Sequence, residues 1–228
     1  MNIKFLGTGG AFDFEKGTAA AIVNVAGKNI LIDCGFSTIL KLTEKDLAKN
    51  IDYILVTHLH GDHVGSLPTL LAYIFHKLGK PVPKIIIPKS SFQTEIQNYL
   101  EATNEGHRGE YISIEEFPNV GFVETTNQHV VGMTSFAYYF SENDHLIYYS
   151  GDIGNADVAK NFLAGRTERR IQVFHETTPR TDISVHASYT EVQEKLQSYE
   201  TYVYHIAKEN MPSGCNLNYV EDYPEFLS

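Results

Sequence analysis

The chain has 228 residues, of which 43% are hydrophobic, and its formal net charge is -10. This length suffices for one well-buried core and does not require two, so we expect a single domain over residues 1–228. The acidic excess argues against broad attraction to DNA or to an anionic membrane surface. The sequence holds neither a signal-like start nor the roughly 18 apolar residues in a row that a membrane helix needs, which predicts a cytoplasmic protein.

The first third of the chain reads as short strands separated by turns, and it ends in a run rich in histidine. Strands are expected at residues 3–6, 19–25, 30–33 and 53–56, and a helix from residue 36 to about residue 42. The fourth of these strands leads directly into Thr57-His58-Leu59-His60-Gly61-Asp62-His63. Apolar residues then recur at helical spacing from residue 64 to residue 78. The run is therefore predicted to lie on a loop between a strand and a helix.

The rest of the chain continues to mix strands with helices. Strands are expected at residues 85–87, 111–117, 121–125, 134–140, 146–150, 171–174 and 201–204. Helices are expected at residues 91–103, at residues 157–164 and after the capping-box pattern Thr190-Glu191-Val192-Gln193. Two batches of strands with helices around them favour two stacked sheets covered by helices on both faces. Residues 211–228 are expected to pack over a neighbouring edge or a partner subunit.

The histidine-rich run carries the chemistry. His58, His60, Asp62 and His63 place three imidazoles and a carboxylate within six residues. Imidazole and carboxylate are ligands that suit zinc and other first-row divalent metals. In an extended segment His58 and His60 share a face and can point at one ion, whereas the turn at Gly61 lets Asp62 and His63 face a second ion. The alternative is a polar loop that is merely rich in histidine.

A strand ending in His-x-His-x-Asp-His, preceded by a Gly-Thr-Gly turn and by an Asp after the third strand, resembles the metallo-β-lactamase superfamily. The resemblance implies an α/β (α+β) sandwich, the four-layer αββα fold of that superfamily. It implies two divalent metal ions, with zinc first and manganese or iron as alternatives. By the same resemblance one ion is held by His58, His60 and His129, the other by Asp62, His63 and His205, and Asp152 bridges them.

A second pair of segments narrows the resemblance. Val173-Phe174-His175-Glu176-Thr177-Thr178, followed by Val185-His186-Ala187-Ser188, is similar to paired elements of ribonuclease Z and its relatives. That similarity implies that Glu176 orients His186 and that His186 faces the scissile phosphate. A metal-bridged hydroxide would attack the phosphate while the imidazolium protonates the leaving oxygen. The expected catalytic residues are therefore Asp62, Glu176 and His186. Three other histidines match no motif and are expected to be structural or exposed: His76, His107 and His145.

Ribonuclease Z proteins that mature transfer RNA usually carry a long arm between the positions of His129 and Asp152. Here that interval reads as a plain hairpin. The missing arm favours a phosphodiesterase acting on a small phosphodiester, such as a cyclic nucleotide, or on RNA. Three alternatives stay open: a transfer RNA 3′ endonuclease, a hydrolase of an ester, thioester, lactone or lactam on the same fold, and a non-catalytic metal-stabilised scaffold. Relatives of this kind are often dimers, so a homodimer is expected.

Overall fold

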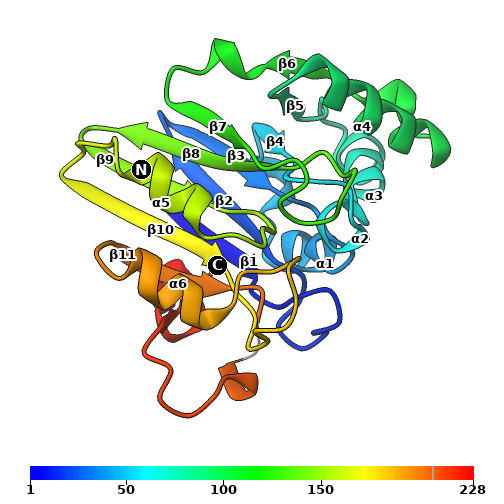
Figure 1. Cartoon of the computed structure of the whole chain (residues 1–228). Coiled ribbons are helices and arrows are strands. Elements are labelled where there is room, and N and C mark those ends of the chain that lie inside the picture. Colours follow the sequence, from blue (N-terminus) through cyan, green and yellow to red (C-terminus); the bar gives the residue numbers. More distant parts are fainter. Residues whose placement is uncertain (207) are drawn as a thin grey trace.

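In the computed structural model, the chain forms two six-stranded mixed sheets that pack together, with helices on the outside (Figure 1). The structure describes residues 1–206 and 208–228. The first sheet has the order β1 (Asn2–Gly7), β2 (Ala20–Val25), β3 (Lys28–Ile32), β4 (Tyr53–Leu55), β5 (Lys84–Ile87) and β6 (Tyr111–Ser113). The second has the order β12 (Asn218–Tyr219), β11 (Glu200–Tyr204), β10 (Arg170–Glu176), β9 (His145–Tyr149), β8 (Phe136–Glu142) and β7 (Val120–Glu124).

Strand direction decides where the loops meet. In the first sheet β3, β4, β5 and β6 are parallel to one another, and in the second β9, β10, β11 and β12 are parallel. β1 runs with β3, because each is antiparallel to β2, and β7 runs with β9, because each is antiparallel to β8. Within each sheet, the segments that follow these strands therefore all leave on the side where the strands have their carboxyl ends.

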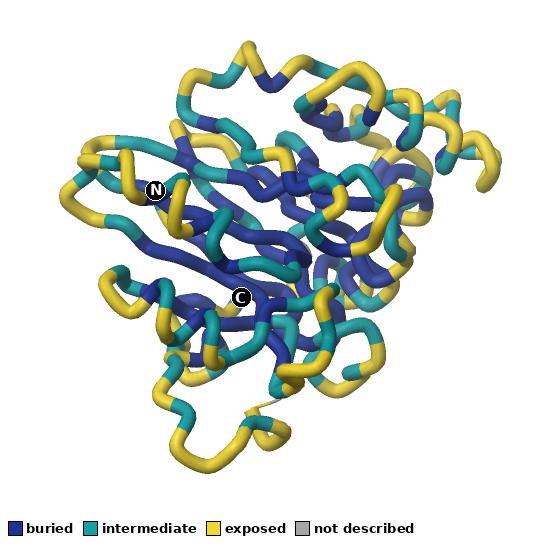
Figure 2. Tube along the Cα trace, viewed as in Figure 1, coloured by how far each residue is buried: buried dark blue, intermediate teal, exposed yellow. Residues whose placement is uncertain are grey.

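The central core lies between the sheets. The ring of Phe5 in β1 lies 6.1, 5.5 and 5.4 Å, between centroids, from the rings of Tyr149, Phe174 and Tyr204 in the second sheet. The Tyr138 hydroxyl donates to the Val56 carbonyl at 2.7 Å and so satisfies a buried polar group across the same interface. Figure 2 shows the sheets as mostly buried and the surrounding loops as exposed.

The helices cover both outer faces. α1 (Thr38–Glu44), α3 (Leu67–Ala72) and α4 (Ser90–Ala102) add buried side chains to the cluster that contains the first sheet. α5 (Asp157–Leu163) and α6 (Tyr189–Leu196) pack against the second sheet, where Leu163, Val192 and Leu196 are buried with Tyr148 and Val173. The predicted sandwich with helices on both faces is confirmed.

Several predicted boundaries were wrong. α1 begins at Thr38 rather than at residue 36, and the strand expected over residues 111–117 ends at Ser113, followed by a 3₁₀ turn, Ile114–Glu116. The apolar stretch from residue 64 to residue 78 is divided into α2 (Gly61–Val64), α3 and a π-helical turn, Tyr73–Lys77. α3 starts as a separate helix at Leu67, because Ser66 precedes it as the N-cap residue and Pro68 stands in its first turn.

The predicted start of α6 was also wrong, by two residues. Its N-cap is Ser188, whose hydroxyl accepts from the amide of Glu191, and the predicted cap Thr190 lies inside the helix. An isolated bridge between Thr178 and Ser188 holds Ser188 in the extended conformation that an N-cap requires.

The C-terminal stretch packs on its own chain. β12 pairs with β11 at the edge of the second sheet, and the ring of Phe226 lies 5.1 Å from Phe174 and 4.6 Å from Tyr202. The expectation that residues 211–228 cover a neighbouring edge is thus confirmed. Cys34 and Cys215 are free thiols. Over the described residues, no helix has the length and apolarity needed to cross a lipid bilayer.

Candidate metal centre

The predicted ligands come from separate strands and meet at one edge of the sandwich. Residues 58–63 follow β4 and include α2. The other three follow the ends of β7, β9 and β11, and they are His129, Asp152 and His205. Potential ligand atoms of all seven residues fall into two groups, each within 4.8 Å, which share this edge. Ligand sites in open α/β sheets also collect at the carboxyl ends of strands.

The first group consists of three imidazoles, His58, His60 and His129. Nε2 of His58 lies 3.0 Å from Nδ1 of His60, and Nε2 of His129 lies 3.1 Å from the same atom. Burial and the charge of His63 lower the pKa of His58 well below its usual value, and burial and His129 lower the pKa of His60. Neutral imidazoles whose nitrogens converge have the protonation state that binds a cation.

Hydrogen bonds on the outer side of these rings determine which nitrogen faces inward. Nδ1 of His129 donates to the Val185 carbonyl at 2.6 Å, which leaves the lone pair on Nε2. Nδ1 of His58 lies 3.0 Å from the Thr57 hydroxyl, which itself donates to Asp33 at 2.9 Å and so accepts from His58. Such outer contacts are how proteins orient metal-binding histidines.

The second group contains Asp62, His63, Asp152 and His205. Nε2 of His63 lies 3.4 Å from a carboxylate oxygen of Asp62 and 3.4 Å from one of Asp152, and Nε2 of His205 lies 3.4 Å from the same two carboxylates. Nδ1 of His63 donates to Asp33 at 2.8 Å. Nε2 of His63 and Oδ1 of Asp152 are buried without a hydrogen-bond partner in the described structure. Burying polar atoms without a partner is unfavourable, and an ion bound between these two atoms would satisfy both.

The charges of the site favour cations. Asp33, Asp62 and Asp152 are 0%, 7% and 2% exposed. Burial opposes the ionisation of both Asp62 and Asp152. A hydrogen bond with His205 nevertheless lowers the pKa of Asp62, and the charges of His205 and His63 hold the pKa of Asp152 well below its usual value. Burial likewise opposes a charge on His63, yet Asp152 and Asp33 raise the pKa of His63 well above normal, and a divalent ion bound here would take the place of the proton on Nε2. Buried carboxylates around orphaned imidazole nitrogens fit divalent metal ions.

The predicted pair of Glu176 and His186 forms beside these groups. Nδ1 of His186 lies 3.2 Å from Oε1 of Glu176 and 4.0 Å from Asp152. The same glutamate oxygen accepts from the amides of Ile153 and Ala187 at 2.9 and 3.3 Å, so the carboxylate is fixed in place. Burial lowers the pKa of His186, but the hydrogen bond with Glu176 outweighs it and raises the pKa to about 9.

A cleft of about 430 Å³ opens over the two groups. Its wall includes His60, Asp62, Asp152, His186 and His205, and also two phenylalanines that the sequence reasoning did not single out, Phe12 and Phe36. The three histidines that were expected to be structural or exposed lie outside this site. His76 and His107 contact Arg108 at the surface, and Nε2 of His145 lies 2.9 Å from the side-chain oxygen of Gln172.

Asp33 entered the sequence analysis only as part of the family resemblance and Thr57 was given no role, although both contact the predicted ligand histidines. Asp33 accepts from Thr57 and His63, and it adopts a left-handed backbone conformation with φ 63°. His205 shares that conformation with φ 65°. Each such residue costs on the order of 1–3 kcal/mol, and such strain clusters at functional sites. A signal was present for Asp33, because an acidic residue directly follows a buried apolar strand.

Gly35 lets the segment after β3 approach the loop that carries Asp62. A β-carbon at position 35 would lie 1.8 Å from the Asp62 carbonyl oxygen. We therefore expect Gly35→Ala to lower the free energy of unfolding by about 3 kcal/mol or more. Gly165→Ala is the control, because its β-carbon would meet nothing within 4 Å. Urea denaturation of both variants measures the difference, and equal midpoints would refute the close approach.

Comparisons with known proteins agree with this architecture. The chain is 28% identical over 216 residues to "Anti-Pycsar protein Apyc1" of Saccharibacillus brassicae, which covers 87% of each protein. It is 45% identical over 89 residues to "Ribonuclease Z" of Clostridium tetani, but that match covers 38% of this chain and only 28% of the relative. The metallo-β-lactamase fold protein YhfI of Bacillus subtilis superposes with a TM-score of 0.69 at 18% identity, covering 91% of this chain and 89% of that one.

These matches confirm the predicted metallo-β-lactamase fold and the kinship with ribonuclease Z. They also confirm the predicted enzyme class, a metal-dependent hydrolase. A family model described as "Anti-Pycsar protein Apyc1" matches residues 1–213, which is nearly the whole chain. The chain therefore belongs to the Anti-Pycsar protein Apyc1 family, within the ribonuclease Z-like part of the metallo-β-lactamase superfamily.

Proposed function

We propose that this protein is a phosphodiesterase that binds two divalent metal ions and cleaves a small phosphodiester such as a cyclic nucleotide. One observation carries the proposal. Asp152 lies 3.9 Å from His129 in the first group, 3.4 Å from His63 in the second and 4.0 Å from His186. Residues of both predicted ligand groups, together with the candidate proton donor His186, thus lie around the Asp152 carboxylate in one cleft.

In this proposal His58, His60 and His129 hold one ion, Asp62, His63 and His205 hold the other, and Asp152 lies between them. Zinc suits these nitrogen and oxygen ligands, and so do manganese and iron. When bound, the ions would polarise the phosphate and supply an activated water.

The proton chemistry is proposed to depend on His186. Glu176 accepts from its Nδ1, so the other ring nitrogen is free to protonate the leaving oxygen. Glu176 itself is fully buried and acts by holding the ring in place. Asp62 is the third catalytic candidate, because its carboxylate lines the cleft and lies 3.4 Å from both His63 and His205.

Four observations favour a small substrate over transfer RNA. Between His129 and Asp152 the chain forms the hairpin of β8 and β9, with no protruding arm. The net charge of -10 disfavours a large polyanion. The cleft of about 430 Å³ lies within the roughly 300–1,000 Å³ typical of small-molecule sites. The relatives described as Apyc1 also match over most of their length, unlike the ribonuclease Z of Clostridium tetani.

A substrate screen tests the proposal. The metal-loaded protein is assayed against 3′,5′- and 2′,3′-cyclic nucleotides, short RNA and unprocessed transfer RNA, and turnover of a cyclic nucleotide is expected. Processing of transfer RNA alone would favour the endonuclease alternative. Lactonase or esterase activity without phosphodiesterase activity would favour the carboxylic alternative. Fewer than two ions per chain with no hydrolysis would indicate a scaffold. The expected homodimer is tested by light scattering.

Metal removal should destabilise the fold. An ion present at 1,000 times its Kd stabilises a protein by about 4 kcal/mol, which for a chain of this size corresponds to a Tm shift of roughly 8–16 °C. We expect a strong chelator to lower the Tm by about this amount and added zinc to restore it, as measured by calorimetry. An unchanged Tm after complete metal removal would show that the buried carboxylates and imidazoles do not need the ions.

A further inference from the structure

Three phenylalanine rings are exposed beside the metal cleft. Phe12, Phe14 and Phe36 are 89%, 75% and 40% exposed, and Phe12 and Phe36 both line the cleft. Large apolar side chains left in water around a concave site mark a surface that binds something. The proposed mechanism uses none of these rings.

The loop that carries Phe12 is held in place. Within it the amide of Asp13 donates to the Gly10 carbonyl at 3.2 Å and the amide of Gly17 donates to the Asp13 carbonyl at 3.1 Å. Lys16 then ties the loop to the C-terminal part of the chain, with Nζ 2.6 Å from Glu221 and 3.1 Å from Glu209. The exposed ring of Phe12 therefore stands on an ordered support.

Neighbouring contacts place the rings beside two of the predicted metal ligands. A β-carbon at Gly10 would lie 3.5 Å from the His205 ring, so the turn before Phe12 rests on a proposed metal ligand. Phe36 directly follows Gly35, which abuts Asp62, and its ring is braced by Phe14 at 6.0 Å between centroids. Phe12 thus stands beside His205, and Phe36 stands beside Asp62.

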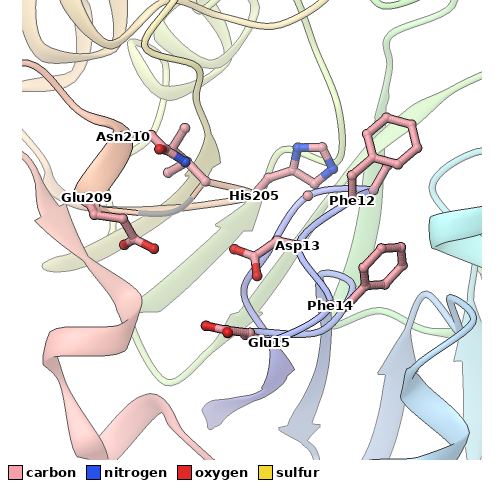
Figure 3. Close-up of a pocket in the computed structure, with 10 residues that line it drawn as sticks. Phe12, Asp13, Phe14, Glu15, His205, Glu209 and Asn210 are labelled. Atoms are coloured by element: carbon pink, nitrogen blue, oxygen red, sulfur yellow. The ribbon is translucent and has the colours of Figure 1, made fainter.

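The two sides of the Phe12 loop differ in chemistry. Figure 3 shows Phe12 and Phe14 projecting from one side, whereas Asp13 and Glu15 project from the other side, toward Glu209. These carboxylates line a neighbouring cavity of about 530 Å³ that Phe12 also borders. Like charges repel, so a phosphate is disfavoured in that cavity, whereas divalent ions held by the predicted ligands would attract it to the cleft. Phe12 borders both the acidic cavity and the cleft, so an uncharged aromatic part of the same substrate can pack against its ring.

We infer that Phe12 stacks on the nucleobase of the substrate and that Phe36, which contacts Phe14 of the same loop, adds apolar surface to the cleft. The inference rests on the proposed function, because it assumes that the phosphate lies over the metal ligands. An aromatic ring binds the π-face of any base, and its contribution goes mainly into substrate affinity. Phe12 is therefore a specificity-determining residue that selects phosphodiesters carrying a base.

Kinetics provide the first test. Phe12→Ala should raise the KM for 3′,5′-cyclic AMP by about 5- to 150-fold, equivalent to about 1 to 3 kcal/mol, with kcat little changed. Phe12→Tyr should recover most of the affinity, because it keeps the aromatic face. Ribose 3′,5′-cyclic phosphate without a base should show the same KM with Phe12→Ala as with the parent protein. Phe75→Ala is the matched control, since Phe75 is 53% exposed and does not line the cleft.

Fluorescence provides a second test that needs no turnover. The chain has no tryptophan, so Phe12→Trp introduces a single indole, and Phe75→Trp does the same away from the cleft. Titration with a slowly hydrolysed phosphorothioate of cyclic AMP should quench the first variant in a saturable manner and the second only in proportion to concentration.

The two tests separate the two proposals. If the parent protein hydrolyses cyclic AMP, but Phe12→Ala keeps its KM and Phe12→Trp shows no saturable quenching, the stacking inference is overturned while the proposed function stands. If the parent protein hydrolyses no cyclic nucleotide but Phe12→Trp is quenched saturably, the proposed function fails and a base-binding surface remains.

Discussion

Asp152→Ala should give a folded protein that retains less than one metal ion per chain and has no measurable phosphodiesterase activity. Asp152 is 2% exposed and lies within 4.0 Å of His129, His63, His205 and His186. Removing its charge leaves His63 and His205 without the carboxylate that lies between the two donor groups. Both proposed metal positions lose a neighbour at once, so the effect should exceed that of losing one ligand from one group.

Metal content by mass spectrometry, after loading with zinc and removal of free ions, measures the first effect, and hydrolysis of bis(p-nitrophenyl) phosphate measures the second. Circular dichroism shows whether the variant is folded. Asp157→Ala is the matched control, because Asp157 is nearby in sequence but 46% exposed, paired with Lys195 at 2.7 Å. Two ions per chain and full turnover in Asp152→Ala would refute the bridging position.

The histidine-rich run could be recognised in the sequence as a candidate metal site because its pattern is local. The strand before His58 is confirmed, but the turn predicted at Gly61 is instead the start of α2, so Asp62 and His63 lie in a short helix rather than on a loop. His129 and His205 carry no such signal, since a lone histidine after a strand is usually a surface residue. They could be proposed only through the order of motifs in a known family. What unites them in space is strand direction, which places the ends of β7 and β11 at the edge where β4 ends.

Other features depend on tertiary contacts that no local pattern reports. The register of α6 is one example, because Ser188 and Thr190 both precede a Glu or Gln by three residues, and only the bridge from Thr178 selects Ser188. Phe36 is another. Its place before α1 depends on the approach of Gly35 to Asp62, and this contact joins segments far apart in sequence. Phe12 reads as an ordinary loop residue until its loop is seen to rest against His205.

His186→Ala should retain both metal ions yet lose about 10²- to 10⁴-fold in kcat on substrates with an alkoxide leaving group, the usual range for a general acid. The imidazole lies 3.2 Å from Glu176 and lines the cleft, but it is absent from both proposed ligand sets. The loss should therefore appear in catalysis rather than in metal content. Glu176→Gln should have a smaller effect in the same direction, because an amide still accepts from Nδ1 but no longer stabilises the charged ring.

The leaving group distinguishes proton donation from a merely structural role. A p-nitrophenolate departs without needing a proton, so bis(p-nitrophenyl) phosphate should lose far less activity in His186→Ala than a cyclic nucleotide, whose leaving oxygen is a poor one. His145→Ala serves as the control, because its ring contacts Gln172 outside the site. An equal loss on both substrates would mean that His186 positions the phosphate, and the leaving oxygen would then have to take its proton from another group in the cleft.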